Sequence, residues 1–224
     1  KDIREGDRVI VQRAGDVIPQ IVGPAGEHHP GTKPFKMPKK CPLCGANIVK
    51  PEGEAMHRCP NRACPSRGLE TLINWVQGPA DIDGVGEQLM RRLWELGLVR
   101  SLPDLYRLTK EQLLELDGFQ EKSASNAIEA IERSKGTPFS RVLLGLNIPD
   151  VGWVTAQNLA RHFGDVDRLE AASQEDVVEV EGIGAERAEA IVEWFSDEAN
   201  QALVEELRHL GLRFEAGPEE RPVE

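Results

Sequence analysis

The sequence predicts a mainly α-helical chain that begins with a β-hairpin and a small four-cysteine module. Three observations predict it: a Gly-apolar-Gly unit that recurs four times, four cysteines within 24 residues, and two short strand-like segments at the start. From them we expect a partial β-barrel over 1–30, a linker and metal module over 31–68, a helical domain over 69–215, and a tail or linker over 216–224.

The first thirty residues indicate a hairpin. Residues 6–13 alternate enough to form a strand, and residues 17–22 form a second one after a turn. One hairpin of this size cannot bury a core, so we expect it to be the end of a β-barrel. Residues 23–38 contain seven Gly or Pro and indicate a linker. We assign no role to His28 and His29, which fall inside it.

All four cysteines lie in two close pairs separated by fourteen residues. This arrangement is typical of two knuckles that offer four thiolates to one tetrahedral zinc ion. Two disulfides or four unrelated thiols are the alternatives, and disulfides are disfavoured in a chain that we expect to be cytoplasmic. No coordination position stays open, so we expect a structural zinc and a solvated His57. The predicted ligands are Cys41, Cys44, Cys59 and Cys64.

The net charge of -11 is unevenly distributed. A negative total argues against a nucleic-acid partner. However, residues 31–78 carry 8 basic and 3 acidic side chains, a net +5, whereas residues 136–224 carry 7 and 19, a net -12. Basic side chains are often only a solvated face, but phosphate contact is an equal alternative in so small a module. The bases are Lys33, Lys36, Lys39, Lys40, Lys50, Arg58, Arg62 and Arg67.

Residues 79–211 contain a unit that recurs four times, at steps of 34, 32 and 32 residues. Each copy predicts a short helix, a turn with an apolar middle residue, and a second helix. A longer duplication supports the repeat, because 109–118 matches 173–182 class for class, and each stretch begins with a capping-box residue. The four turns begin at Gly84, Gly118, Asp150 and Gly182.

Such a unit is the helix-hairpin-helix motif, which holds a DNA phosphate without reading sequence. The glycines let another surface approach closely, and the first N–H groups of the second helix form an anion site. A lone copy is often an ordinary turn, and a copy can be purely architectural, but four copies favour DNA binding. The expected contacts are Gly84, Gly86, Gly118, Gly152, Thr155, Gly182 and Gly184, with Lys122 and Arg187 as the best side-chain contacts.

Two copies depart from the pattern. The second has Gln120 in place of the closing glycine, and the third has Asp150 in place of the opening one. An acidic side chain repels phosphate, so the third hairpin is the weakest candidate or uses only Gly152 and Thr155. Trp153 follows in the first turn of the next helix, where it packs against a neighbour or lies against a sugar.

Together these motifs resemble bacterial NAD-dependent DNA ligases. The resemblance rests on Arg13-Ala-Gly-Asp-Val-Ile-Pro19, on the Cys41 to Gly45 and Cys59 to Cys64 knuckles, and on Gly118-Phe-x-Glu-Lys-Ser-Ala124. It covers nearly the whole chain and implies the end of an oligonucleotide-binding (OB) barrel, a four-cysteine zinc finger and a helix-hairpin-helix domain. It also implies that these parts wrap nicked duplex DNA in replication and repair. The residues implied in the minor groove near the nick are Arg13, Val17 and Ile18.

One element of that family is missing from the sequence. The family's nucleophile is the lysine of a Lys-x-Asp-Gly motif, and the chain contains no such motif and no candidate NAD pocket. We therefore expect that this polypeptide does not form lysyl-AMP by itself. By the resemblance, NAD and Mg²⁺ serve a nucleotidyltransferase domain located in cis, and a BRCT domain, if present, follows Glu224. We expect a monomer.

Two other classes of function compete with this interpretation. A non-catalytic helix-hairpin-helix module would bind DNA or four-way junctions without serving an enzyme. A zinc-scaffolded protein adaptor would use the acidic C-terminal third as its contact face. No apolar run is long enough to span a membrane, and the first residues lack the apolar stretch of a signal peptide.

Overall fold

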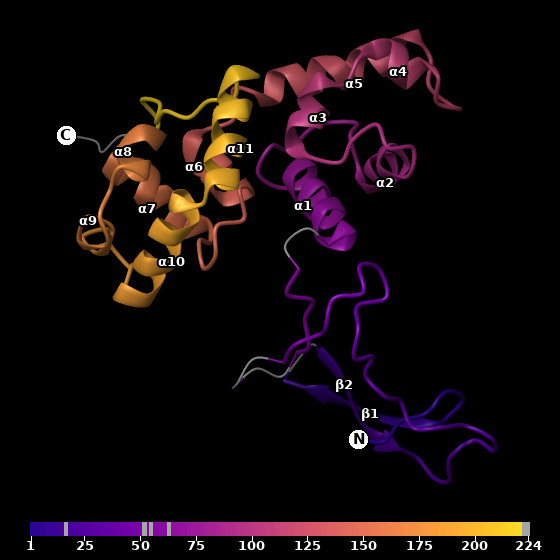
Figure 1. Cartoon of the computed structure of the whole chain (residues 1–224). Helices are drawn as coiled ribbons and strands as arrows, with labels where there is room; N and C mark the ends of the chain where they lie inside the picture. The colour runs from indigo at the N-terminus through magenta and orange to yellow at the C-terminus, as the bar shows by residue number, and fades with distance from the viewer. Residues whose placement is uncertain (16–17, 51–52, 54–55, 62–63, 221–224) are drawn as a thin grey trace. The chain divides into compact units, whose positions relative to one another are not determined.

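The computed structural model describes residues 1–15, 18–50, 53, 56–61 and 64–220. They belong to two compact units, residues 1–64 and residues 65–224 (Figure 1). The first unit contains the strands and the four cysteines, and the second is helical. The mainly helical fold with one small antiparallel sheet confirms the predicted fold class.

The first unit opens with the expected hairpin. Strand β1 (Val9–Ala14) pairs antiparallel with β2 (Ile18–Pro24), with an irregularity in register between Ile10 and Val11. Apolar side chains are exposed on this hairpin, Ile10 by 51%, Val11 by 54% and Ile18 by 68%. A two-stranded sheet with this much exposed apolar surface has no core of its own.

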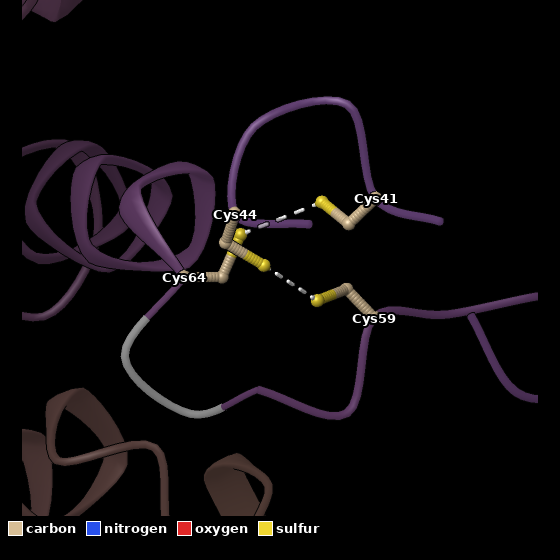
Figure 2. Close-up of side chains that lie close together, drawn as sticks. All are labelled: Cys41, Cys44, Cys59 and Cys64. Atoms are coloured by element: carbon tan, nitrogen blue, oxygen red, sulfur yellow. Dashed lines mark hydrogen bonds between the residues drawn. The ribbon is translucent and has the colours of Figure 1, made fainter. Parts of the chain in front are cut away.

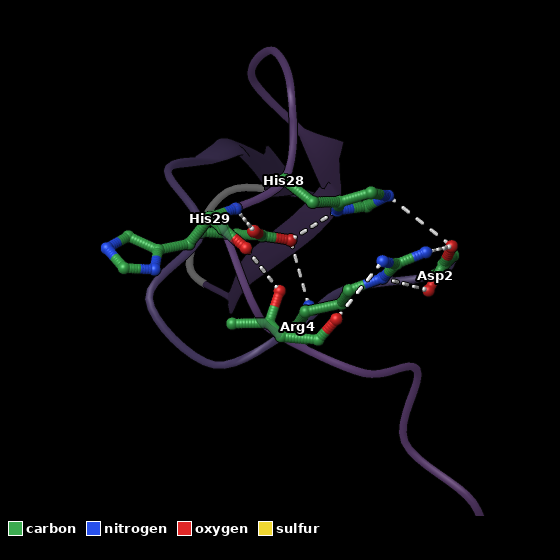
Figure 3. A network of polar contacts seen from close by, with 6 residues as sticks. Asp2, Arg4, His28 and His29 are labelled. Carbon is green, nitrogen blue, oxygen red and sulfur yellow. Dashed lines mark hydrogen bonds and ion pairs between the residues drawn. The ribbon is translucent and has the colours of Figure 1, made fainter.

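A polar network fastens the segment after β2 to the start of the chain (Figure 3). The side chain of Asp7 is only 1% exposed. Its carboxylate accepts hydrogen bonds from the N–H groups of Arg4 and His29, both at 2.9 Å, and lies 2.8 Å from Nδ1 of His28. The other ring nitrogen of His28 lies 3.4 Å from Asp2. Assigning His28 and His29 no role was therefore wrong: both bind the buried carboxylate, a contact between residues about twenty positions apart.

This network makes the first unit sensitive to acid. Hydrogen bonds from the His28 ring and the N–H of His29 lower the pKa of Asp7 from 3.8 to about 2. A carboxyl group with a lowered pKa stabilises the fold above its ordinary pKa, and this contribution is lost as the pH falls toward 2. We expect the His29 amide to lose hydrogen-exchange protection between pH 4 and 2, and in Asp7→Ala at neutral pH, because alanine offers no acceptor for its N–H. Protection factors that stay at the wild-type value in Asp7→Ala would contradict this role.

The second unit contains eleven helices within residues 65–220. Most are short and amphipathic, so their stability comes from packing of apolar faces. Their bounds are α1 (Pro65–Gln77), α2 (Glu87–Glu95), α3 (Leu102–Arg107), α4 (Lys110–Leu114), α5 (Glu121–Ser134), α6 (Phe139–Gly145), α7 (Trp153–Phe163), α8 (Val166–Glu170), α9 (Gln174–Val178), α10 (Ala185–Ser196) and α11 (Glu198–His209).

Close packing between α1 and α6 joins segments distant in sequence. Trp75 of α1 is fully buried, and a Cβ added at Gly145 of α6 would lie 2.1 Å from its ring. The indole N–H of Trp75 donates to the hydroxyl of Tyr106 at 3.0 Å, and that hydroxyl lies 3.0 Å from Ser134. The polar atoms of Trp75, Tyr106 and Ser134 in this part of the core are thus paired.

The predicted duplication within the helical unit is confirmed in its capping. Thr109 caps α4 and Ser173 caps α9, and each forms a capping box with the residue three positions on, Gln112 and Asp176. Helices α4 and α5 therefore carry the second hairpin as α9 and α10 carry the fourth. Two stretches that match in residue class have produced the same local structure.

The segment expected to be a tail, 216–224, packs against the helical unit as far as it is described. Ala216 is buried, and its N–H donates to the carbonyl of Gly164 at 2.7 Å. The carboxylate of Glu220 accepts hydrogen bonds from the N–H groups of Phe139 and Ser140, at 3.0 and 2.7 Å. It thereby satisfies two amides at the N-terminus of α6, where Pro138 offers no side-chain cap.

Candidate metal centre and nucleic-acid interface

The four cysteine sulfurs of the first unit converge on one point (Figure 2). All four Sγ atoms lie within 4.8 Å of one another, with 3.8 Å between Cys41 and Cys64 and 3.4 Å between Cys44 and Cys59. Tetrahedral ligands at a Zn–S length of about 2.3 Å lie roughly 3.8 Å apart. Disulfide sulfurs would be about 2.05 Å apart. The cluster is therefore a metal-binding site whose donors and spacing fit zinc.

Backbone turns bring these sulfurs together. Gly45 has a φ of 72°, a left-handed conformation that glycine adopts freely, and its N–H donates to the carbonyl of Cys41 at 2.9 Å. The N–H of Ala46 lowers the pKa of the Cys44 thiol to about 6. At Cys59 the N–H of Asn61 also favours the thiolate, but burial and the neighbouring sulfurs raise the pKa to about 12. The cluster thus needs a cation to hold four thiolates.

The basic side chains between residues 31 and 67 that the structure describes are exposed. No acidic residue occurs from 28 to 50, and Lys33, Lys36, Lys39, Lys40 and Lys50 are all on the surface. None of them forms an ion pair with a residue that the structure describes. Arg58 is exposed as well, Arg62 lies outside the described residues, and Arg67 is exposed on α1. Exposed cations on a short module can reach a polyanion.

Each of the four hairpins contains a turn of the same type. Its third residue has a positive φ in every copy: 77° at Gly84, 87° at Gly118, 59° at Asp150 and 80° at Gly182. The next residue, which is apolar, donates its N–H to the carbonyl three positions earlier at 3.1 to 3.2 Å. These are the features of a type II turn. Asp150, which departs from the pattern, still adopts the conformation that the turn requires.

The closing residue of each turn begins the second helix. Gly86, Gly152 and Gly184 have φ values of -94°, -90° and -92° as N-caps of α2, α7 and α10, and Gln120 is the N-cap of α5 with φ -128°. Any residue adopts such angles, which explains why Gln120 is tolerated. A Cβ at any of these three glycines would meet nothing within 4 Å. The fold itself therefore does not require glycine there, whereas close approach by a ligand does.

The other predicted contacts vary in exposure. Arg13 is exposed and Val17 lies outside the described residues. Lys122 is exposed on α5 and Thr155 is half-buried on α7. The Arg187 guanidinium turns back toward its own hairpin, where Nη1 donates to the carbonyl of Gly182 at 2.8 Å. Trp153 is 48% exposed beside Gly152, so it does not pack fully against a neighbour among the residues described.

Sequence reasoning missed two side chains that hold the hairpins together. Arg92 donates to the carbonyl of Asp117 at 2.7 Å, and Asn158 donates to the carbonyl of Glu181 at 3.0 Å. Each donor lies six residues after the closing glycine of one hairpin, and each acceptor precedes the left-handed glycine of the next. The equal spacing of the two donors from their glycines could have been found in the sequence. A search for residues of the same class would have missed it, because one donor is Arg and the other is Asn.

No helix among the described residues has the length and apolar character needed to cross a membrane.

Comparison with known proteins gives three family matches. Residues 40–65 match the NAD-dependent DNA ligase C4 zinc finger domain, residues 78–133 the SAM-like helix-hairpin-helix tandem, and residues 141–204 the helix-hairpin-helix motif.

Curated relatives match the chain over its length. It is 49% identical to a DNA ligase of Rubrobacter xylanophilus, over 100% of this chain and 33% of that protein. It is 47% identical to a DNA ligase of Synechococcus sp. (94% and 32%) and 43% identical to one of Bacillus pumilus (100% and 34%). The chain spans about a third of the length of these relatives. Since its metal module also matches the family's own zinc finger, the chain belongs to the NAD-dependent DNA ligase family.

Proposed function

We propose that the chain is the DNA-binding portion of an NAD-dependent DNA ligase that seals nicks in duplex DNA. The observation that carries this proposal is the fourfold turn. In every copy a left-handed residue precedes an extended N-cap, and a helix N-terminus follows. The first N–H groups of a helix have no partner within it, and together they favour an anion. Four such groups of amides suit four backbone phosphates.

The charge distribution agrees with binding through backbone amides. Residues 65–224 carry 16 basic and 31 acidic side chains, so the hairpins sit on an acidic unit, whereas the bases of residues 31–64 add positive charge nearby in sequence. A phosphate held by amides needs little side-chain charge, and surrounding acid discourages unspecific binding. Lys122 and Arg187 are proposed to add to the phosphate sites, and Arg13, Val17 and Ile18 to contact the minor groove.

Several properties of the whole enzyme are part of this proposal. The zinc is structural. The β-hairpin of residues 1–30 completes an OB barrel. Residues 31–68 form the linker and the zinc finger, residues 69–215 form the helix-hairpin-helix domain, and residues 216–224 are a tail or linker. Adenylation with NAD and Mg²⁺ takes place on a nucleotidyltransferase domain in cis, because the chain has no Lys-x-Asp-Gly sequence. The enzyme works in the cytoplasm, and the chain is a monomer.

Binding to duplex DNA at several salt concentrations tests the proposal. We expect the chain to bind nicked duplex with a modest preference over intact duplex. We also expect log K to fall linearly with log salt, because phosphate contacts release counterions at a slope of about -0.9 per phosphate on duplex DNA. Fluorescence anisotropy with nicked, intact and four-way-junction probes provides the measurement.

Two alternative functions would give different results. A free-standing junction-binding module would prefer the four-way junction to the nicked duplex. A protein adaptor that uses the acidic residues 136–224 would bind no duplex even at low salt, and that outcome would refute DNA binding altogether. The exposed apolar surface of the β1–β2 hairpin favours the ligase over a free-standing module, because a hairpin without a core needs further strands to pack on.

A further inference from the structure

The duplicated architecture repeats one hydrogen bond that the local motif does not contain. Arg92 of α2, the helix after the first hairpin, donates from Nη1 to the carbonyl of Asp117 at 2.7 Å in the second hairpin. Asn158 of α7, the helix after the third hairpin, donates from Nδ2 to the carbonyl of Glu181 at 3.0 Å in the fourth. The same bond thus joins the first hairpin to the second and the third to the fourth.

The acceptor is the same peptide unit in both pairs. Asp117 and Glu181 are the second residues of their type II turns, and their carbonyls belong to the peptide that joins them to Gly118 and Gly182. A trans peptide is planar, with its C=O and N–H pointing in opposite directions. A donor that holds the carbonyl therefore aims the N–H of the following glycine away from the helix that supplies the donor. The N–H groups of Gly118 and Gly182 have no hydrogen-bond partner among the described residues.

The donor side chains of the two pairs differ in chemistry but occupy equivalent positions. The Arg92 guanidinium is 38% exposed and lies 3.8 Å from the Asp117 carboxylate, so charge supports that bond. Asn158 is half-buried and neutral. In the fourth hairpin, Arg187 adds a second donor to the neighbouring carbonyl of Gly182 at 2.8 Å. Different side chains at one position of a duplication that make the same contact indicate a requirement for the contact and not for the side chain.

We infer that Arg92 and Asn158 are positioning residues for phosphate binding. Each fixes the central peptide of the neighbouring turn so that the N–H of Gly118 or Gly182 faces a phosphate oxygen, and each couples two hairpins into one rigid clamp. This inference rests on the proposed function. It assigns the second and fourth hairpins a phosphate donor in the turn itself, in addition to the helix N-termini.

Asn158→Leu is the primary test because it removes the donor without changing charge or the number and branching of the side-chain heavy atoms. The matched control is Gln157→Leu, on the neighbouring half-buried residue of α7, which makes no hydrogen bond to the fourth hairpin among the described residues. We expect Asn158→Leu to weaken binding to nicked duplex about tenfold, because the misplaced Gly182 amide would lose its charge-assisted hydrogen bond to the phosphate. In ¹⁵N spectra, the Gly182 amide should lose its shift on DNA addition, whereas the Gly86 amide should keep it.

The first pair offers an independent test. Arg92→Met should weaken binding, Arg92→Lys should restore part of it by keeping a donor, and Arg91→Gln should change little. Arg91 carries the same charge one residue away but pairs with Glu87 at 2.8 Å and not with a hairpin. The measurements are made well below the melting temperature of each variant, so that a purely structural role affects melting and leaves the Gly118 amide response unchanged.

The outcomes separate this inference from the proposed function. If the wild-type chain binds no duplex, the proposed function fails. If the wild type binds and Asn158→Leu and Arg92→Met keep its affinity and glycine amide responses, the inference is overturned and DNA binding stands. The inference also fails if Gln157→Leu and Arg91→Gln lose as much affinity as the variants of the two donors.

Discussion

Removal of the metal by chelation is expected to unfold residues 40–64 while the helical unit stays folded. Structural zinc sites of this kind contribute roughly 10 kcal/mol to folding. The first unit has little else to replace that contribution, because Cys41 and Cys64 are its only buried apolar residues among those described. In addition, the sulfurs lie too close together to remain as thiolates without a cation.

Two spectroscopic signals measure the effect separately. Amide cross-peaks of residues 40–50 should collapse to unfolded positions after chelation, and the far-UV circular dichroism of the helices should change little, because all four cysteines lie within residues 1–64. Cys41→Ser should have the same effect without a chelator, and His57→Ala, at an exposed residue outside the cluster, should not. A folded 40–64 segment in metal-free protein would show that the site is not structural.

Replacement of Gly86 and Gly184 by Asp is expected to reduce DNA binding strongly while leaving the fold intact. Both glycines are N-caps in extended conformation, with open space where a Cβ would stand. Asp is among the most favourable N-cap residues, so each helix should be as stable as before or slightly more stable. The new carboxylate would accept hydrogen bonds from the amides proposed to hold phosphate, and it would repel the phosphate itself.

We expect each substitution to weaken binding to nicked duplex at least about tenfold, which corresponds to roughly 1.4 kcal/mol. Gly86→Ser and Gly184→Ser are the controls, because serine caps a helix without adding charge and should weaken binding less. Melting temperatures recorded for the same variants show that the fold is unchanged. If the Asp variants bind duplex as tightly as the wild type, the phosphates are held elsewhere, and the basic stretch of residues 28–50 becomes the main candidate.

Much of the architecture could be predicted because its signals are local. The strands at Val9–Ala14 and Ile18–Pro24, the capping boxes of α4 and α9, and the left-handed residue of each turn depend on side chains a few positions apart. The metal ligands could also be predicted directly, since the sequence contains four cysteines and all of them lie within 24 residues. The linker was harder to interpret, because His28 and His29 have no pattern of their own and acquire a role only from the buried Asp7.

By itself, then, the sequence determined the kinds of element in this protein: a β-hairpin, a four-cysteine metal module and four helix-hairpin-helix turns. It also indicated the resemblance to a ligase family. Only the tertiary structure decided how these elements are held. The contacts of His28 with Asp7, Arg92 with Asp117, Asn158 with Glu181, and Glu220 with α6 join residues between 21 and 81 positions apart. Periodicity and turn chemistry report on neighbours along the chain, whereas such contacts depend on which surfaces the packing of apolar faces brings together.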